Sequence, residues 1–270
     1  MTNKRKIGVG IVTYNRPRTL QKLIKSIPTG VVDEMVIVND GTPNEVTKSS
    51  NCMNLGGRGV GFAKNACLRE LYARGCTDFF LIEDDMYIKD PNVFDMYIHT
   101  AKDSGIHHLN FSQHGKANQT RQGVPDPKLA VSFNDTTVQF YENCVGAFSY
   151  YTLHYIEEVG LLDNKYYNAI EHIDHTYMGI QKNLHPNFWY FADISSSWEY
   201  IGDDGWSPEQ SVIASANDQT KLFRAGLDVF ETKHGINLLD IPKVSEDEAL
   251  TTIKQNYKNK NENLYSYPTK

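Results

Sequence analysis

The first 85 residues contain short apolar runs that alternate with stretches of apolar side chains at helical spacing. Runs rich in β-branched and aromatic residues predict buried strands at 7–14, 35–38, 52–55 and 79–82. Apolar residues three and four positions apart predict helices over 20–27 and 62–74. This order predicts an α/β fold, in which a mostly parallel sheet is flanked by helices.

The rest of the chain is less regular and predicts a smaller, mixed half. Helices are expected at 93–98, 153–159 and 171–183, and strands at 107–111 and 188–194. Residues 112–135 are polar, contain Gly and Pro, and predict a long loop. We expect one domain over 1–240, with halves at about 1–105 and 106–240, followed by a charged, partly helical tail over 241–270.

Composition limits the classes of function. The formal net charge of −6 argues against a broad nucleic-acid clamp, although it leaves room for a local basic groove. The four cysteines form no CxxC pair, which favours buried free thiols and a reducing compartment. No apolar run is long enough for a signal peptide or a membrane span, so we expect a cytoplasmic protein, in the host cytoplasm if it is viral.

Polar clusters follow three of the predicted strands. Ligands of parallel sheets bind beyond the carboxyl ends of the strands, so these clusters are expected to form one shared site. The clusters are Thr13-Tyr14-Asn15-Arg16, Asn39-Asp40 and Glu83-Asp84-Asp85.

The acidic cluster Glu83-Asp84-Asp85 follows four apolar residues. Adjacent carboxylates repel one another, so a compensating cation is favourable. Oxygen ligands of this kind suit Mn²⁺ or Mg²⁺. An acidic triplet in isolation is more often a solvated turn, but its place at the end of a buried strand favours the metal.

Residues 56–61 form a glycine-rich segment before a predicted helix. Backbone N–H groups at the start of a helix attract anions, so the segment could cradle a phosphate. It lacks the Gly-Lys-Ser/Thr of a Walker motif, and an ordinary turn explains its spacing equally well.

Two further segments carry candidate chemistry. Residues 171–175 place two acids and two histidines close together, which suits a general base, a metal ligand or a solvated helix face. A zinc site is a competing hypothesis, although the HExxH order is absent. In residues 198–206, glycines would allow a mobile loop in which Trp206 closes over a sugar, unless the segment is a surface turn with Trp198 in the core.

These motifs together resemble the inverting family-2 class of GT-A glycosyltransferases. The matching stretches are IVTYNRP at 11–17, VNDG at 38–41, NLGGRGVGFAKN at 54–65, LIEDD at 81–85, Gly146 with VGLLD at 159–163, and EHID at 171–174. The resemblance covers about residues 5–205, and its specificity lies in the order and spacing of the motifs. It implies a donor half over 1–105 and an acceptor half over 106–240.

The resemblance also implies a role for individual residues. The nucleotide sugar, with uridine as its nucleoside, would be bound by Thr13, Tyr14, Asn15, Arg16, Asp40, Gly57, Lys64, Asn65, Glu83 and Asp84. The metal would be held by Asp85, Glu83 and Glu199, the last in place of a family histidine, and the acceptor would lie near Gly146 and Trp206. The family base is an Asp at the position of His172, so the base is expected to be His172, Glu171 or Asp174.

The function implied is a metal-dependent transfer of a sugar from a UDP-sugar to a hydroxyl of a glycan or sugar, with inversion. Three alternatives stay open. The acceptor could be a hydroxymethylated or glucosylated DNA base, as phage enzymes modify. The chain could be a non-catalytic sugar-binding module, or a metal hydrolase that uses the acids and histidines.

Overall fold

The computed structural model describes residues 4–48, 52–113, 116–204 and 219–261. The strands are β1 (Ile7–Thr13), β2 (Glu34–Asn39), β3 (Cys52–Asn54), β4 (Asp78–Glu83), β5 (Met86–Ile88), β6 (His108–Asn110), β7 (Leu129–Phe133), β8 (Thr136–Tyr141), β9 (Phe148–Thr152), β10 (Phe191–Ile194) and β11 (Ile201–Asp203). The helices are α1 (Pro17–Ser26), α2 (Val60–Ala73), α3 (Val93–Ser104), α4 (Leu153–Val159), α5 (Glu171–Gln181), α6 (Ser197–Tyr200), α7 (Gln219–His234) and α8 (Glu246–Asn261), with 3₁₀ turns η1 (Lys116–Asn118) and η2 (Leu238–Asp240).

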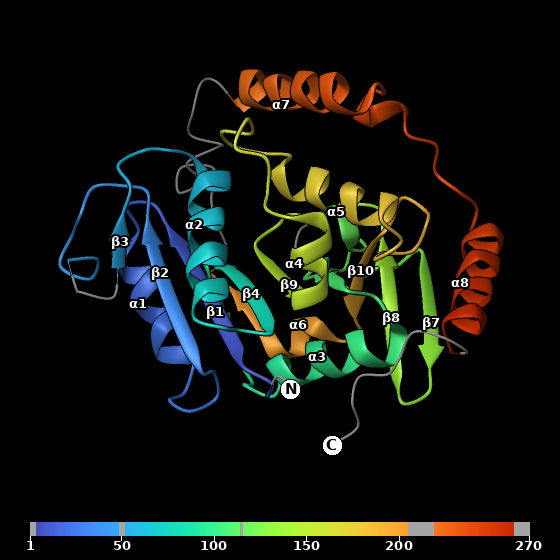
Figure 1. Cartoon of the computed structure of the whole chain (residues 1–270), viewed down its shortest axis with the longest axis horizontal. Coiled ribbons are helices and arrows are strands. Elements are labelled where there is room, and N and C mark those ends of the chain that lie inside the picture. The colour runs from blue at the N-terminus through green and yellow to red at the C-terminus, as the bar shows by residue number, and fades with distance from the viewer. Residues whose placement is uncertain (1–3, 49–51, 114–115, 205–218, 262–270) are drawn as a thin grey trace.

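A six-stranded sheet in the order β3-β2-β1-β4-β9-β6 forms the centre of the molecule (Figure 1). Strands β3, β2, β1 and β4 are parallel, whereas β9 runs antiparallel to both of its neighbours. The predicted α/β fold with a mostly parallel sheet is therefore confirmed. The carboxyl ends of β1, β2 and β4 lie at one edge, which brings the three predicted polar clusters together.

Alternate side chains of β4 pack against helices on opposite faces of the sheet. Phe79 and Leu81 belong to the apolar cluster that α2 and α4 cover, and Phe80 and Ile82 belong to the cluster that α1 and α3 cover. A strand that is buried on both faces has a continuous run of apolar residues in its sequence. This run explains why β4 is easy to predict.

Glycines on β1 allow α2 to pack close to the sheet. A Cβ atom at Gly8 would lie 2.6 Å from Cys76 Sγ, and one at Gly10 would lie 2.5 Å from Cys67 Cβ. Larger side chains at these two positions would push α2 and its following turn away from the strand.

The second half of the chain adds a three-stranded antiparallel sheet in the order β10-β8-β7 and a two-stranded ribbon of β5 and β11. The prediction of one long loop over 112–135 is wrong for its last part, because β7 lies within it and pairs with β8. The exposed and buried side chains alternate along β7, as on an edge strand with one face in water.

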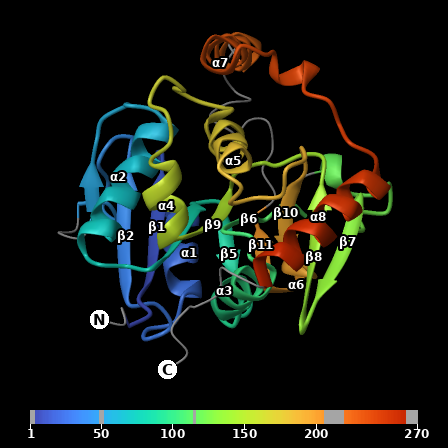
Figure 2. The same cartoon turned by 45° about the vertical axis from the view of Figure 1, so that its right-hand side comes forward.

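The expected charged tail contains α8, which packs on the β7–β8 side of the molecule (Figure 2). Ala249 and Ile253 of α8 are buried in the main apolar cluster, so this helix is part of the core rather than a free extension. All four cysteines are free; Cys67 and Cys76 are buried, and Cys52 and Cys144 are partly buried. Within the described ranges, no helix is both long and apolar enough to cross a membrane.

Candidate active site

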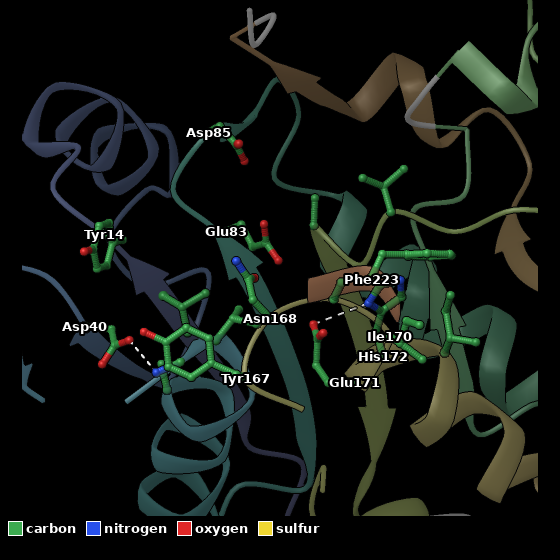
Figure 3. Close-up of a pocket in the computed structure, with 18 of the residues that line it drawn as sticks. Tyr14, Asp40, Glu83, Asp85, Tyr167, Asn168, Ile170, Glu171, His172 and Phe223 are labelled. Atoms are coloured by element: carbon green, nitrogen blue, oxygen red, sulfur yellow. Dashed lines mark hydrogen bonds and ion pairs between the residues drawn. The ribbon is translucent and has the colours of Figure 1, made fainter. Parts of the chain in front are cut away.

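A cavity of about 640 Å³ opens at the carboxyl ends of β1, β2 and β4. The donor half contributes Thr13, Asp40, Glu83 and Asp85 to its wall, among other residues. The acceptor half contributes residues that precede and begin α5, including Glu171 and His172, and two residues of α7, Thr220 and Phe223. In Figure 3, Glu83 and Asp85 lie between Asp40 and His172 in the view.

The glycine-rich segment before α2 binds the carboxylate of Asp40. The backbone N–H groups of 57, 58 and 59 donate to Asp40 over 3.0, 2.6 and 2.7 Å. These three donors are therefore already used by a protein anion, and Gly57 does not line the cavity. The segment places Asp40 at the cavity wall, which favours its interpretation as a structural turn over that of an open phosphate cradle.

Arg16 lies between the last two members of the acidic cluster. Its guanidinium is 2.9 Å from an oxygen of Asp84 and 2.9 Å from Oδ2 of Asp85. Burial opposes the charge on Arg16, but the two carboxylates outweigh it and raise the pKa of the guanidinium. Arg16 thus supplies part of the positive charge that the acidic cluster requires.

Asp84 and Asp85 have different surroundings. Asp84 is fully buried and accepts a hydrogen bond of 2.5 Å from Thr13 Oγ1. Burial raises the pKa of Asp84 to about 7, although Arg16 and the Thr13 hydroxyl act in the opposite direction. Asp85 lines the cavity, and its buried Oδ1 has no hydrogen-bond partner among the described residues. Asp85 and Glu83 line the cavity, whereas Asp84 does not, so these two carboxylates are the members of the cluster that a ligand could reach.

Lys64 is a buried residue that bridges one carboxylate from each half of the cavity wall. Its Nζ lies 2.9 Å from Oε1 of both Glu83 and Glu171. The ammonium also donates to the carbonyl oxygen of Gly146 over 3.1 Å, and the side chain is only 2% exposed. Burial alone would lower the pKa of Lys64, but the two carboxylates reverse the effect and raise it. Lys64 is therefore a buried structural cation rather than a direct nucleotide ligand.

His172 is held at the cavity wall by the same group of residues. Its Nδ1 is 3.3 Å from Glu171 Oε1, and its Nε2 is 3.2 Å from the carbonyl oxygen of Cys144. Gly146 adopts a left-handed conformation with φ of 70°, and a Cβ atom there would lie 2.6 Å from His172 Cγ. The absence of a side chain at Gly146 is what makes room for the imidazole.

Comparison with solved structures identifies the fold around this cavity. S. aureus TarS residues 1–349 in complex with UDP-GlcNAc superimposes with a TM-score of 0.58 and 13% identity, over 96% of this chain and 73% of that chain. The mannosyltransferase PcManGT from Pyrobaculum calidifontis, in complex with GDP-Man and Mn²⁺, gives a TM-score of 0.54 and 11% identity, over 97% of this chain and 77% of that chain. The fold is that of the GT-A glycosyltransferases.

The chain spans 44% of a longer TarS structure, which it matches with a TM-score of 0.53. No family model matches the sequence, and no curated protein matches it at the sequence level. At these identities the likeness establishes the GT-A fold, and the chemistry has to be argued from the residues of the cavity.

Several predicted site residues of the GT-A domain lie outside the cavity. Asn65 is buried and binds both backbone groups of Leu162 and the side chain of Asn164. Asn15 has φ of 56°, and its Oδ1 accepts from the backbone N–H of Thr42. Both residues fix loops around the cavity, and their expected contact to the nucleotide stays a prediction.

The predicted catalytic cluster of α5 divides between two environments. Glu171 and His172 face the cavity, whereas Asp174 is buried against α7. Asp174 lies 2.7 Å from Lys233 Nζ and 2.6 Å from His234 Nε2. This placement corrects the expectation of a catalytic Asp174, because its carboxylate is already paired and holds α7 to α5.

Glu199 does not join the acidic cluster. The β5–β11 register places Asp203 opposite Met86, and the N–H of Asp204 donates to the carbonyl oxygen of Asp85. Glu199 is exposed in α6, beyond the other end of this ribbon, so its expected role as a metal ligand is corrected. Trp206, the other predicted residue of this segment, lies outside the described residues.

A divalent metal fits the cavity if the substrate supplies most of its ligands. Within the described part of the chain, no three His, Cys, Asp or Glu side chains are grouped so as to hold a metal by themselves. Mg²⁺ is commonly held by one or two carboxylates together with substrate phosphates, and Asp85 and Glu83 fit this arrangement.

The segment that precedes α5 contains no predicted site residue but forms part of the cavity wall. Tyr167, Asn168, Ala169 and Ile170 all line the cavity, and the last two have φ of 79° and 72°. Left-handed backbone is costly for residues with a Cβ, so this strained turn is held by its surroundings. The contribution of Phe223 from α7 was also not predicted, because only the tertiary fold brings it to the cavity.

Proposed function

We propose that this protein is a metal-dependent glycosyltransferase that moves a sugar from a nucleotide-diphosphate sugar to an acceptor hydroxyl. The observation that carries the proposal is the common cavity of about 640 Å³, which joins Asp40, Glu83 and Asp85 at the strand ends to Glu171 and His172. The nucleotide sugars in the complexes of TarS and the mannosyltransferase support the choice of donor class. Among nucleotides we propose UDP, with Thr13, Tyr14 and Asp40 on its side of the cavity.

Asp85 is the proposed metal ligand, with Glu83 beside it. When bound, the metal neutralises the charge that develops on the departing diphosphate. Asp85 would supply a carboxylate oxygen from the cavity wall, and Arg16 orients this carboxylate through its ion pair with Oδ2. Mn²⁺ and Mg²⁺ are both compatible with these oxygen ligands.

His172 is the proposed general base. The neighbouring Glu171 is a poor base, because Lys64 and His172 outweigh the effect of burial and lower the pKa of its carboxyl. Both ring nitrogens of His172 face acceptors, Glu171 Oε1 and the carbonyl oxygen of Cys144, so a neutral imidazole donates to only one of them. To act as the base, His172 donates from Nδ1 to Glu171, and Nε2 turns away from Cys144 so that its lone pair takes the proton of the acceptor hydroxyl. Attack of that hydroxyl on the anomeric carbon displaces the nucleoside diphosphate and inverts the configuration.

The test is turnover of a donor panel, namely UDP-glucose, UDP-galactose, UDP-GlcNAc and GDP-mannose, with Mn²⁺ or Mg²⁺. We expect nucleotide release from at least one UDP-sugar, and a loss of about 10²–10³-fold in Asp85→Ala, as for removal of an electrostatic stabiliser of the transition state. Asp95→Ala is the matched control, because Asp95 is exposed on α3 and pairs only with Arg5 at the surface among the described residues. Full activity of Asp85→Ala, or activity in excess chelator, would exclude the proposed metal site.

A further inference from the structure

A second, smaller cavity lies beside the β5–β11 ribbon. Its volume is about 230 Å³, which is room for a single sugar ring. The residues that line it include Tyr87, Phe111 and Trp198, together with Gln113 and Gln119, and Trp198 is the most exposed of the three aromatic residues. Aromatic faces combined with a few fixed polar groups are typical of sites that bind small polar ligands.

The side chain of Trp198 is exposed, although its backbone N–H and carbonyl groups are both hydrogen-bonded. Its N–H donates to Gln113 Oε1 over 3.1 Å, and its carbonyl oxygen accepts from Lys89 Nζ over 2.8 Å. Gln113 is itself 1% exposed and donates to Gln139 and to the carbonyl oxygen of Ile194. The residue nevertheless leaves 47% of its surface exposed, so a rigid backbone presents an unburied indole at the cavity.

Tyr87 forms a second fixed aromatic surface. Gly202 lies opposite Tyr87 in the ribbon, and a Cβ atom there would lie 2.3 Å from the ring. The ammonium of Lys22 sits 3.7 Å from the ring centroid and pairs with Asp204. The close approach of the glycine and the cation holds the ring in place, so it does not need a ligand to be ordered.

The ribbon connects this cavity to the proposed active site. Asp85 lines the larger cavity, and Tyr87, two residues further on, lines the smaller one. Tyr87 lies in β5 and Asp85 in the turn that enters this strand, so neighbouring positions of the chain line the two cavities. The N–H of Asp204 donates to the carbonyl oxygen of Asp85, so the ribbon is anchored at the acidic cluster.

We propose that the smaller cavity binds one sugar ring of a saccharide acceptor, with the indole of Trp198 stacked on the ring. The side chain of Gln119 at the wall provides a partner for hydroxyl groups, because its Nε2 donates to the carbonyl oxygen of Gln113 and its amide oxygen is a further acceptor. This inference rests on the proposed transferase function, since it specifies the acceptor as a saccharide of more than one unit. It also gives Trp198 a role other than the core packing that its size would suggest.

The experiment is saturation-transfer NMR on the full chain with the larger cavity occupied by UDP and the diamagnetic Mg²⁺. The probes are the methyl glycosides of glucose, galactose, mannose and N-acetylglucosamine. We expect saturable binding of at least one glycoside, weakened about tenfold or more in Trp198→Ala and largely retained in Trp198→Phe, which keeps an aromatic face. Tyr72→Ala is the matched control, because Tyr72 is 49% exposed on α2 and lines neither cavity.

The affinity for UDP is measured in the same samples by calorimetry. The affinity should be equal in the wild type and the three variants. Equal affinity would show that the variants are folded and that the donor site is intact. If UDP binds but no glycoside does, or if Trp198→Ala binds glycoside like the wild type, the saccharide subsite is refuted and the proposed function stands. If UDP does not bind to any of the proteins, the proposed function itself fails, and with it the acceptor role of the smaller cavity.

Discussion

Replacing Lys64 with Met removes the ammonium that lies between Glu83 and Glu171 while keeping most of the apolar volume of the side chain. Two carboxylates then face each other, and Glu171 is almost fully buried. Breaking a buried ion pair by removing one partner costs about 3–5 kcal/mol. For a domain of this size, 1 kcal/mol corresponds to about 2–4 °C in Tm, so Lys64→Met is expected to lower Tm by about 6–20 °C.

The loss of Tm should also depend on pH in a defined direction. In the wild type, burial raises the pKa of Glu171, but Lys64 and His172 reverse this and lower it. The stabilisation from this carboxylate is therefore present above the unfolded pKa of 4.5 and is lost as the pH falls further. Without Lys64, burial acts with less opposition and raises the pKa, so the variant is destabilised most at high pH and recovers as the carboxylate takes a proton.

The assay is thermal unfolding of both proteins, without ligands, at several pH values from 8 to 5. The difference in Tm between wild type and Lys64→Met should narrow as the pH falls. Lys48→Met is the matched control, because Lys48 pairs with Glu45 at the surface and such pairs contribute about 0–1 kcal/mol. A Tm loss no larger than that of the control, or a loss that is the same at pH 8 and pH 5, would refute the role of Lys64 as a buried bridge.

Two further substitutions test the placement of single residues. Gly146→Ala puts a Cβ atom 2.6 Å from the ring of His172, so turnover should fall by a larger factor than UDP affinity. Gly160 also has a positive φ, of 85°, but a Cβ atom there meets no neighbour within 4 Å, so Gly160→Ala is the control for backbone strain alone and should keep its turnover. A turnover equal to that of the control would show that His172 does not need its observed position. Asp174→Ala leaves α7 without its buried partner on α5, so amide exchange in α7 should accelerate. The control is Glu231→Gln, because Glu231 is exposed on α7 and its carboxylate accepts a hydrogen bond only from Asn237 among the described residues. Unchanged exchange in α7 would contradict this anchoring role.

The donor half could be predicted from the sequence because its signals are local. A strand buried on both faces gives a continuous apolar run, and the polar residues that follow β1, β2 and β4 meet wherever those strands are parallel. Asp40, Glu83 and Asp85 were found in this way and line one cavity. The detailed use of the glycine-rich segment was not predictable, since nothing in its spacing indicates that it binds Asp40.

The acceptor half depends on contacts between residues far apart in the sequence. Asp174 and Glu171 are three residues apart on one helix, but Asp174 pairs with Lys233 and His234, whereas Glu171 pairs with Lys64. Helical spacing places such residues on a common face without showing which neighbour each one meets. The strained turn at 169–170 and the approach of α7 have no local signal for the same reason.

The central claim is that the cavity beside Asp85 binds a nucleoside diphosphate together with a divalent metal. The most direct measurement is calorimetric titration of UDP into the wild type and Asp85→Ala, each with and without Mn²⁺. The account predicts that Mn²⁺ strengthens UDP binding to the wild type and that this gain is lost in Asp85→Ala. Absence of UDP binding to the wild type under both conditions, or an equal gain from Mn²⁺ in the variant, would contradict it.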